Sequence, residues 1–207
     1  MVREQARFAG AAYDEGIDFE RYNFVIGLAN ETVLWKDLSS RVIFEQLRNG
    51  QATASHQAAY SSLRNRQFDE LGCHSNGAMI CLAALMNEDV KTGAVVLYGP
   101  QITSESLKLW NWLLAEKRIT LLKIVVAEND PVPPAALIFS PALVASPEAH
   151  ALAAPLLFKV DRLAGAIRQM SPQATVETFA CDASLASLRC HDMGGYSAHM
   201  KSKSEEP

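Results

Sequence analysis

The segment from Phe68 to Leu82 constrains the fold of this chain more than any other feature. An apolar strand pattern ends in the sequence Cys-His-Ser-Asn-Gly, and a run of small and apolar residues of helical length follows. A tight turn between a strand and a helix directs the side chain at its tip away from the backbone, and it admits little bulk two residues to either side. Gly77 meets this need behind Ser75, whereas Cys73 stands where glycine is commoner. The incomplete match to G-x-S-x-G predicts a serine presented on a strand-turn-helix unit.

Elsewhere in the chain, short apolar runs alternate with stretches of helical periodicity. We expect strands at 22–27, 68–73, 93–99 and 174–180, and a strand with its turn at 119–133. Helical patterns fall at 36–47, 51–64, 76–87, 104–116 and 147–170. Strands that alternate with helices form a parallel sheet whose connections pack on its faces. The sequence therefore predicts an α/β fold with a five-stranded, mostly parallel sheet and helices on both faces.

Two titratable residues follow later strands of this pattern. Asp130 comes directly after the apolar run of its strand, and His191 lies in the loop after the last predicted strand. Ligands of open α/β sheets bind outside the carboxyl ends of the strands, where Ser75, Asp130 and His191 all fall. Serine, histidine and aspartate together are the groups that nucleophilic acyl transfer requires.

With serine, aspartate and histidine in this order, each after its own strand, the chain resembles the α/β-hydrolase fold family of serine hydrolases. The resemblance covers roughly residues 23–196. It implies a three-layer sandwich and an esterase or lipase activity, the cleavage of carboxylic esters through an acyl-enzyme without cofactor or metal ion. Ser75 would be the nucleophile, His191 the general base, and Asp130 the acid that orients the base.

The resemblance also implies an oxyanion hole built from two backbone N–H groups. One would come from Asn76 at the helix N-terminus, and the other from Leu28 or Ala29 after the first strand. The family's His-Gly signature at the second position is replaced here by Ile26 and Gly27. The first two antiparallel strands of the family, and one strand between residues 27 and 68, are also missing from the pattern. We therefore expect a minimal version of the fold, or a domain of a longer protein.

A proline-punctuated apolar segment at 133–146 follows the aspartate strand. In many hydrolases of this fold, insertions at that place form a lid or an acyl pocket, which Phe139 and Leu143 would then line. The alternative is a helix start that packs without touching a ligand. His74 is a further candidate for substrate contact, although a structural role under the loop is favoured. The expected partner is a small-molecule or lipid ester.

Other titratable residues compete for the roles of acid and base. The alternatives are Asp182, Asp192 and Glu128 for the acid, and His199 for the base. Asp192 would have to fold back on its neighbour His191, and Glu128 would serve only if the strand register differed. His199 lies near the end of the chain. Asp130 and His191 are therefore favoured.

Composition limits the function classes. A chain of 207 residues with 49% hydrophobic residues can bury one core, so we expect a single domain at 1–199 and a disordered charged tail at 200–207. A net charge of −4 without a basic run argues against nucleic acid as a partner. No apolar run reaches the length of a transmembrane segment. Residues 1–7 lack the apolar core of a signal peptide, which makes a cytoplasmic location the default, or delivery as part of a secreted effector.

Four cysteines in a chain of this length do not make a disulfide scaffold. Cys73 and Cys81 flank the serine turn and are expected to be small buried apolar residues. Cys181 and Cys190 bracket the loop that leads to His191. A bridge between them would pin that loop, but it requires an oxidising compartment, and the unbridged state is favoured.

Two functions of other classes stay open. A non-catalytic binding module is favoured by Cys73 and by the missing His-Gly signature. A lipase- or phospholipase-type catalytic domain of a secreted toxin or effector is compatible with the missing early strands. Phosphoryl and hydride transfer are disfavoured, because the sequence contains neither G-x-x-x-x-G-K-[ST] nor G-x-G-x-x-G.

Overall fold

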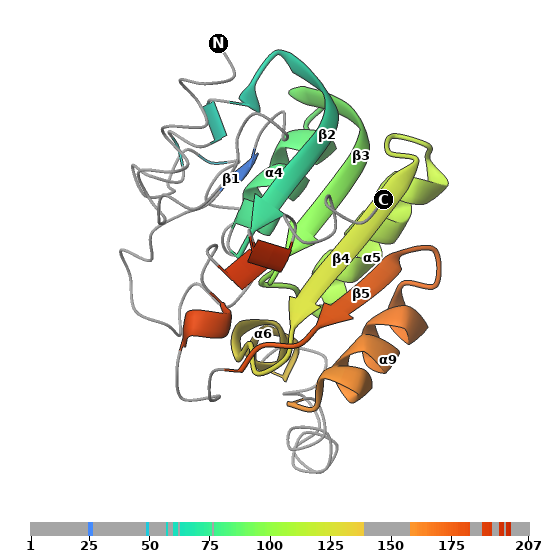
Figure 1. Ribbon diagram of the computed structural model, residues 1–207. Coiled ribbons are helices and arrows are strands. Elements are labelled where there is room, and N and C mark those ends of the chain that lie inside the picture. The colour runs from blue at the N-terminus through green and yellow to red at the C-terminus, as the bar shows by residue number, and fades with distance from the viewer. Residues whose placement is uncertain are drawn as a thin grey trace, which may run out of the picture.

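The computed structural model describes residues 25–26, 49, 57, 60–61, 63–75, 77–138, 158–182, 188–191, 195–196 and 198–199. These residues form an α/β structure around an all-parallel sheet whose strand order is β1-β2-β3-β4-β5 (Figure 1). The strands are β1 Val25–Ile26, β2 Arg66–His74, β3 Val90–Tyr98, β4 Leu121–Ala127 and β5 Thr175–Phe179. Because β1 spans two residues, β2 to β5 make up the body of the sheet. The predicted α/β class and parallel pairing are confirmed.

The longer described helices cover one face of this sheet. They are α4 Gly77–Met86, α5 Ser104–Ala115 and α9 Val160–Met170. The shorter α6 Val132–Ile138 follows the carboxyl end of β4, and a 3-10 helix, η1, spans Leu188–Cys190. Spatial order follows chain order, so right-handed connections all return on the same side of the sheet. Accordingly, α4, α5 and α9 lie behind the sheet in Figure 1, and the C-terminal segments drawn in red lie in front of it.

The alternation of side chains along the strands divides the core into two parts. On the helix side, Leu97 of β3 and Ile124 of β4 join the large apolar cluster that α4, α5 and α9 complete. The next residue along each strand, Tyr98 and Val125, faces the other way and joins a smaller cluster with Tyr196. The C-terminal segment is therefore held against the sheet face that the helices leave open.

The element boundaries differ from the prediction mainly at β3. This strand begins at Val90, three residues before the apolar run that was expected to start at Gly93. Val90 and Thr92 are buried while Lys91 and Gly93 are exposed, so the early part of the strand alternates and escapes a search for continuous apolar runs. The predicted helix at 36–47 lies outside the described residues, as do most of 51–64 and the first part of 147–170.

The cysteine prediction is wrong in its main point, because all four cysteines are paired. Cys73 bonds to Cys81 across the serine turn, and Cys181 bonds to Cys190. Cys73 ends up buried on the helix side of β2, and Cys81 lies four residues into α4. The residue that breaks the glycine pattern thus joins the strand covalently to the helix that follows it.

The apolar segment after β4 is helical where it is described. Leu137 and Ile138 of α6 belong to the large core cluster. This part of the segment therefore packs into the core, as the alternative to the pocket hypothesis required, while Phe139 and Leu143 lie outside the described residues. No helix within the described ranges is long and apolar enough to cross a membrane.

Candidate active site

Ser75 occupies the turn between β2 and α4 in a strained backbone conformation. Its φ is 54°, in the left-handed region that residues with a side chain rarely adopt. Neighbouring backbone groups hold it there. The Ser75 N–H donates to the Tyr98 carbonyl over 3.1 Å, and the Ser75 carbonyl accepts from the N–H groups of Ala78 and Gln101. The turn is therefore fixed to β3 as well as to its own helix, and α4 begins two residues after the serine.

The serine, histidine and aspartate predicted from the sequence lie together at the carboxyl ends of the strands. The Ser75 hydroxyl is 2.9 Å from Nε2 of His191. On the other side of the ring, Nδ1 of His191 lies 3.0 Å from Oδ1 and 3.1 Å from Oδ2 of Asp130. With Nδ1–H donating to the carboxylate, Nε2 is left as an acceptor for the serine hydroxyl. All three side chains are buried, which strengthens their electrostatic coupling.

Asp130 receives two donors besides His191. Its Oδ1 accepts from the backbone N–H of Val132 over 2.9 Å, at the start of α6. Its Oδ2 accepts from the hydroxyl of Tyr196 over 2.6 Å. A buried carboxylate is costly unless its oxygens are hydrogen-bonded, and here both oxygens are. The residue is consequently held in one orientation toward the histidine ring.

Tyr196 and Gly99 belong to this site although the sequence did not indicate either. Gly99 has a φ of +46°, and a Cβ there would lie 2.6 Å from Oδ2 of Asp130 and 2.7 Å from the Tyr196 hydroxyl. The absence of a side chain at Gly99 leaves the space that the aspartate and the tyrosine share. Both contacts are between residues distant in sequence, which periodicity and short motifs cannot reveal.

His74 has the position of a structural residue. It is completely buried, its Nε2 donates to the carbonyl of His191 over 2.7 Å, and the two rings lie 4.8 Å apart. Burial lowers the pKa of His74 well below 6.5, and proximity to His191 lowers it further. A neutral His74 thus ties the end of β2 to the backbone of the candidate base.

The competing residues are placed away from this arrangement. Glu128 and Asp182 are exposed, so neither takes the place of Asp130. His199 pairs with Glu177 over 2.8 Å and stacks on Phe179. The predicted residues outside the described ranges are Leu28, Ala29, Asn76, Phe139, Leu143 and the alternative acid Asp192. Their roles stay predictions.

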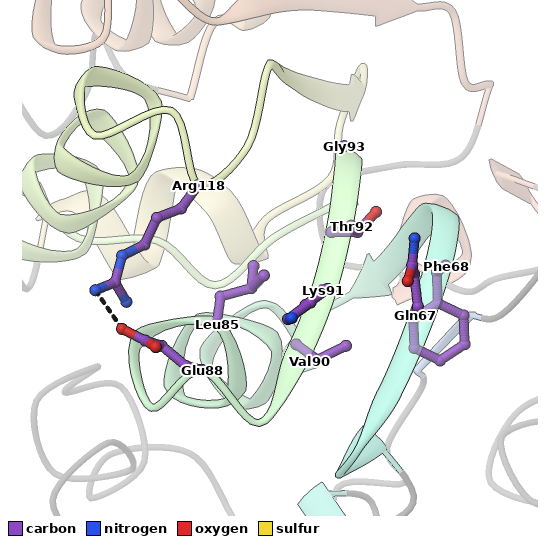
Figure 2. Close-up of a pocket in the computed structure, with 9 residues that line it drawn as sticks. All are labelled: Gln67, Phe68, Leu85, Glu88, Val90, Lys91, Thr92, Gly93 and Arg118. Atoms are coloured by element: carbon purple, nitrogen blue, oxygen red, sulfur yellow. Dashed lines mark hydrogen bonds and ion pairs between the residues drawn. The ribbon is translucent and has the colours of Figure 1, made fainter.

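A cavity of about 390 Å³ lies at the opposite end of the sheet. Figure 2 shows its walls, which include Phe68 of β2, Lys91 of β3 and the ion pair between Arg118 and Glu88. Phe68 and Lys91 lie near the amino ends of β2 and β3, whereas Ser75 follows the carboxyl end of β2. The cavity is therefore separate from the candidate active site.

Comparison of the chain with protein-family models, with curated proteins and with solved structures finds no match. Within the described ranges, no group of three or more His, Cys, Asp or Glu side chains is placed to hold a metal ion.

Proposed function

We propose that the protein is a serine hydrolase of the α/β-hydrolase type that cleaves carboxylic esters through Ser75, His191 and Asp130. The observation that carries the proposal is the continuous hydrogen-bonded chain from the serine hydroxyl through the imidazole to the carboxylate. The positive φ of Ser75 supports it, because a strained turn between strand and helix is the usual setting of a hydrolase nucleophile. The three-layer arrangement of that family belongs to the same proposal.

In the proposed mechanism, the Ser75 oxygen attacks the ester carbonyl carbon while its proton passes to Nε2 of His191. Asp130 keeps the imidazole in the required tautomer and stabilises its cationic form. The proton then moves to the departing alkoxide as the carbon–oxygen bond breaks, leaving an acyl-enzyme. Water attacks the acyl carbon with the same histidine as base, which releases the acid and restores the serine. The N-terminus of α4 favours the developing oxyanion through its positive partial charge.

Labelling with a fluorophosphonate probe tests this proposal, because such probes phosphonylate serines that a base activates. We expect the wild-type protein to be labelled and Ser75→Ala to be unlabelled at unchanged far-UV circular dichroism. His191→Gln should also lose labelling. His199→Gln is the matched control, since His199 is a partly buried histidine paired with a carboxylate, Glu177, outside the hydrogen-bonded chain that contains Ser75. Labelling that persists in folded Ser75→Ala would refute the proposal, and an unlabelled, folded wild-type protein would favour the non-catalytic binding module.

The two disulfides favour a particular setting for this activity. Structural disulfides persist in oxidising compartments and are rare in the cytosol. Here both bridges attach to the segments that carry the proposed nucleophile and base. The second candidate, a lipase- or phospholipase-type domain of a secreted toxin or effector, fits this setting. Membrane leakage on expression in an oxidising compartment, abolished by Ser75→Ala, would distinguish the toxin from an esterase without such an effect.

A further inference from the structure

Tyr196 contacts the candidate acid in a way that fixes the direction of its hydroxyl proton. The Ala127 backbone N–H, which can only donate, points at the Tyr196 oxygen over 3.1 Å. The single hydroxyl proton is thus directed to Oδ2 of Asp130, 2.6 Å away. The tyrosine hydroxyl therefore donates to the Asp130 carboxylate and does not accept from it. His191 contacts the same carboxylate through Nδ1.

The ring of Tyr196 is held as firmly as its hydroxyl. Its side chain is completely buried. It packs edge-on against Tyr98 and Phe179, with ring centroids 6.1 and 5.2 Å away, and lies 5.7 Å from the ring of His74. Aromatic pairs in this geometry are favourable beyond the area that they bury. The donor thus keeps a fixed position while the serine and histidine react.

The hydroxyl keeps its proton across the working range of a hydrolase. Burial, and then the adjacent Asp130 carboxylate, raise the pKa of Tyr196 well above 10. Among the described residues, the titratable groups that contact this pair are His74 from β2, Tyr98 from β3, and His191. His74 stays neutral for the reason given above, so within the described residues His191 is the group whose charge changes beside Asp130 during catalysis.

We propose that Tyr196 is a positioning residue of the active site, which fixes the orientation of Asp130 and limits how strongly its carboxylate attracts a proton on His191. A hydrogen bond donated to a carboxylate draws off part of the negative charge that would otherwise stabilise the imidazolium. Without it, His191 holds its proton more tightly and accepts the serine proton less readily at low pH. The inference rests on the proposed function.

The test compares Tyr196→Phe with Tyr60→Phe. Tyr60 is a matched control, because its hydroxyl likewise donates to an aspartate, Asp89, and accepts from an N–H donor, Asn87, but at the other end of the sheet. We expect the acidic limb of the kcat/KM profile to move up by about 0.5–1 pH unit in Tyr196→Phe, with kcat lowered and KM unchanged. Tyr60→Phe should keep the wild-type profile. A purely structural tyrosine would lower the amount of folded protein without moving the limb.

Two further measurements test the role of Tyr196 without a substrate and without removing its hydroxyl. The ring signal of His191, followed by NMR against pH, should titrate at higher pH in Tyr196→Phe than in wild type, and this readout needs no substrate. If Tyr196→Phe does not fold, site-specific 3-fluorotyrosine at position 196 keeps the hydroxyl and makes it a stronger donor, so the His191 midpoint should fall. An unchanged midpoint would overturn the role of Tyr196. A folded wild-type protein that the fluorophosphonate probe does not label at Ser75 would instead overturn the proposed function. The NMR comparison of His191 would remain valid in that case.

Discussion

Gly99→Ala should damage the active site and the stability of the protein together. The substitution places a methyl group 2.6 Å from Oδ2 of Asp130 and 2.7 Å from the hydroxyl of Tyr196. Ordinary contact begins near 3.4 Å, so the carboxylate must retreat by about 0.8 Å or the backbone must move. Misplacing a reacting group by about 1 Å can cost about 100-fold in rate. We therefore expect fluorophosphonate labelling to slow by about 10- to 100-fold.

The stability cost of Gly99→Ala has two parts. A side chain in the left-handed region, where Gly99 has a φ of +46°, costs about 1–2 kcal/mol. Weakening the hydrogen bond between Tyr196 and the Asp130 carboxylate adds about 1.5 kcal/mol or more. The expected loss in the free energy of unfolding is thus about 3 kcal/mol, measured by urea denaturation with the slope held constant.

Gly93→Ala is the control for this experiment. Gly93 lies within β3, whereas Gly99 directly follows that strand, and a methyl group added at Gly93 would meet only the Thr120 hydroxyl, at an ordinary 3.7 Å. Its labelling rate and unfolding midpoint should stay close to wild type, since surface substitutions of this kind change stability by about 0.5 kcal/mol or less. The reasoning is refuted if Gly99→Ala is labelled at the wild-type rate and unfolds at the wild-type midpoint.

Two other predictions concern the disulfide between Cys181 and Cys190 and the pKa of His74. Replacing Cys181 and Cys190 by serine opens a loop of sequence separation 9, which should lower the free energy of unfolding by about 2.6 kcal/mol and slow labelling, because His191 follows Cys190 directly. Unfolding of the double variant and of the wild type, both under non-reducing conditions, checks the first point, because a reductant would also open the bridge between Cys73 and Cys81. Equal stability of the two proteins would contradict it. His74 has a depressed pKa when folded and one near 6.5 when unfolded, so the unfolded chain binds a proton first and stability should fall as pH drops below 6.5. His74→Gln should flatten this decline in denaturation curves measured between pH 7 and 5; an equally steep decline would assign it to other groups.

The sequence could predict the candidate triad because each member follows an apolar strand. Parallel strands bring their carboxyl ends to one edge, so the strand pattern, together with the serine turn and the family resemblance, led us to expect Ser75, Asp130 and His191 there. The alternation of side chains between the two faces of a strand also follows from the sequence once the strand is assigned, and it explains why Tyr98 faces away from the helices. These are consequences of local patterns that repeat along the chain.

The rest of the site depends on contacts without a local pattern. Tyr196 reaches an aspartate 66 residues earlier, and Gly99 is required by the two side chains that meet in front of it. The disulfide between Cys73 and Cys81 is intermediate between features that local patterns predict and features that depend on distant contacts. With β2 ending at residue 74 and α4 beginning at 77, the Cα atoms of the two cysteines lie 6.6 Å apart, close enough for a disulfide, but those bounds were not predicted from the sequence. The burial of Cys73 was predicted and its partner was not.

The arrangement of the site follows from the order of the strands. Because β2 to β5 are ordered as they occur in the chain, the described helices α4, α5 and α9 lie on one face. The described C-terminal segment packs on the opposite face, and it carries both His191 and Tyr196. One segment therefore supplies the proposed base and the donor to its acid partner, and the bridge at Cys190 joins it to the chain that leaves β5. Any change that loosens this segment should disturb both groups at once. Gly99 directly follows β3 and lies against both Asp130 and Tyr196, so its substitution tests the arrangement most directly.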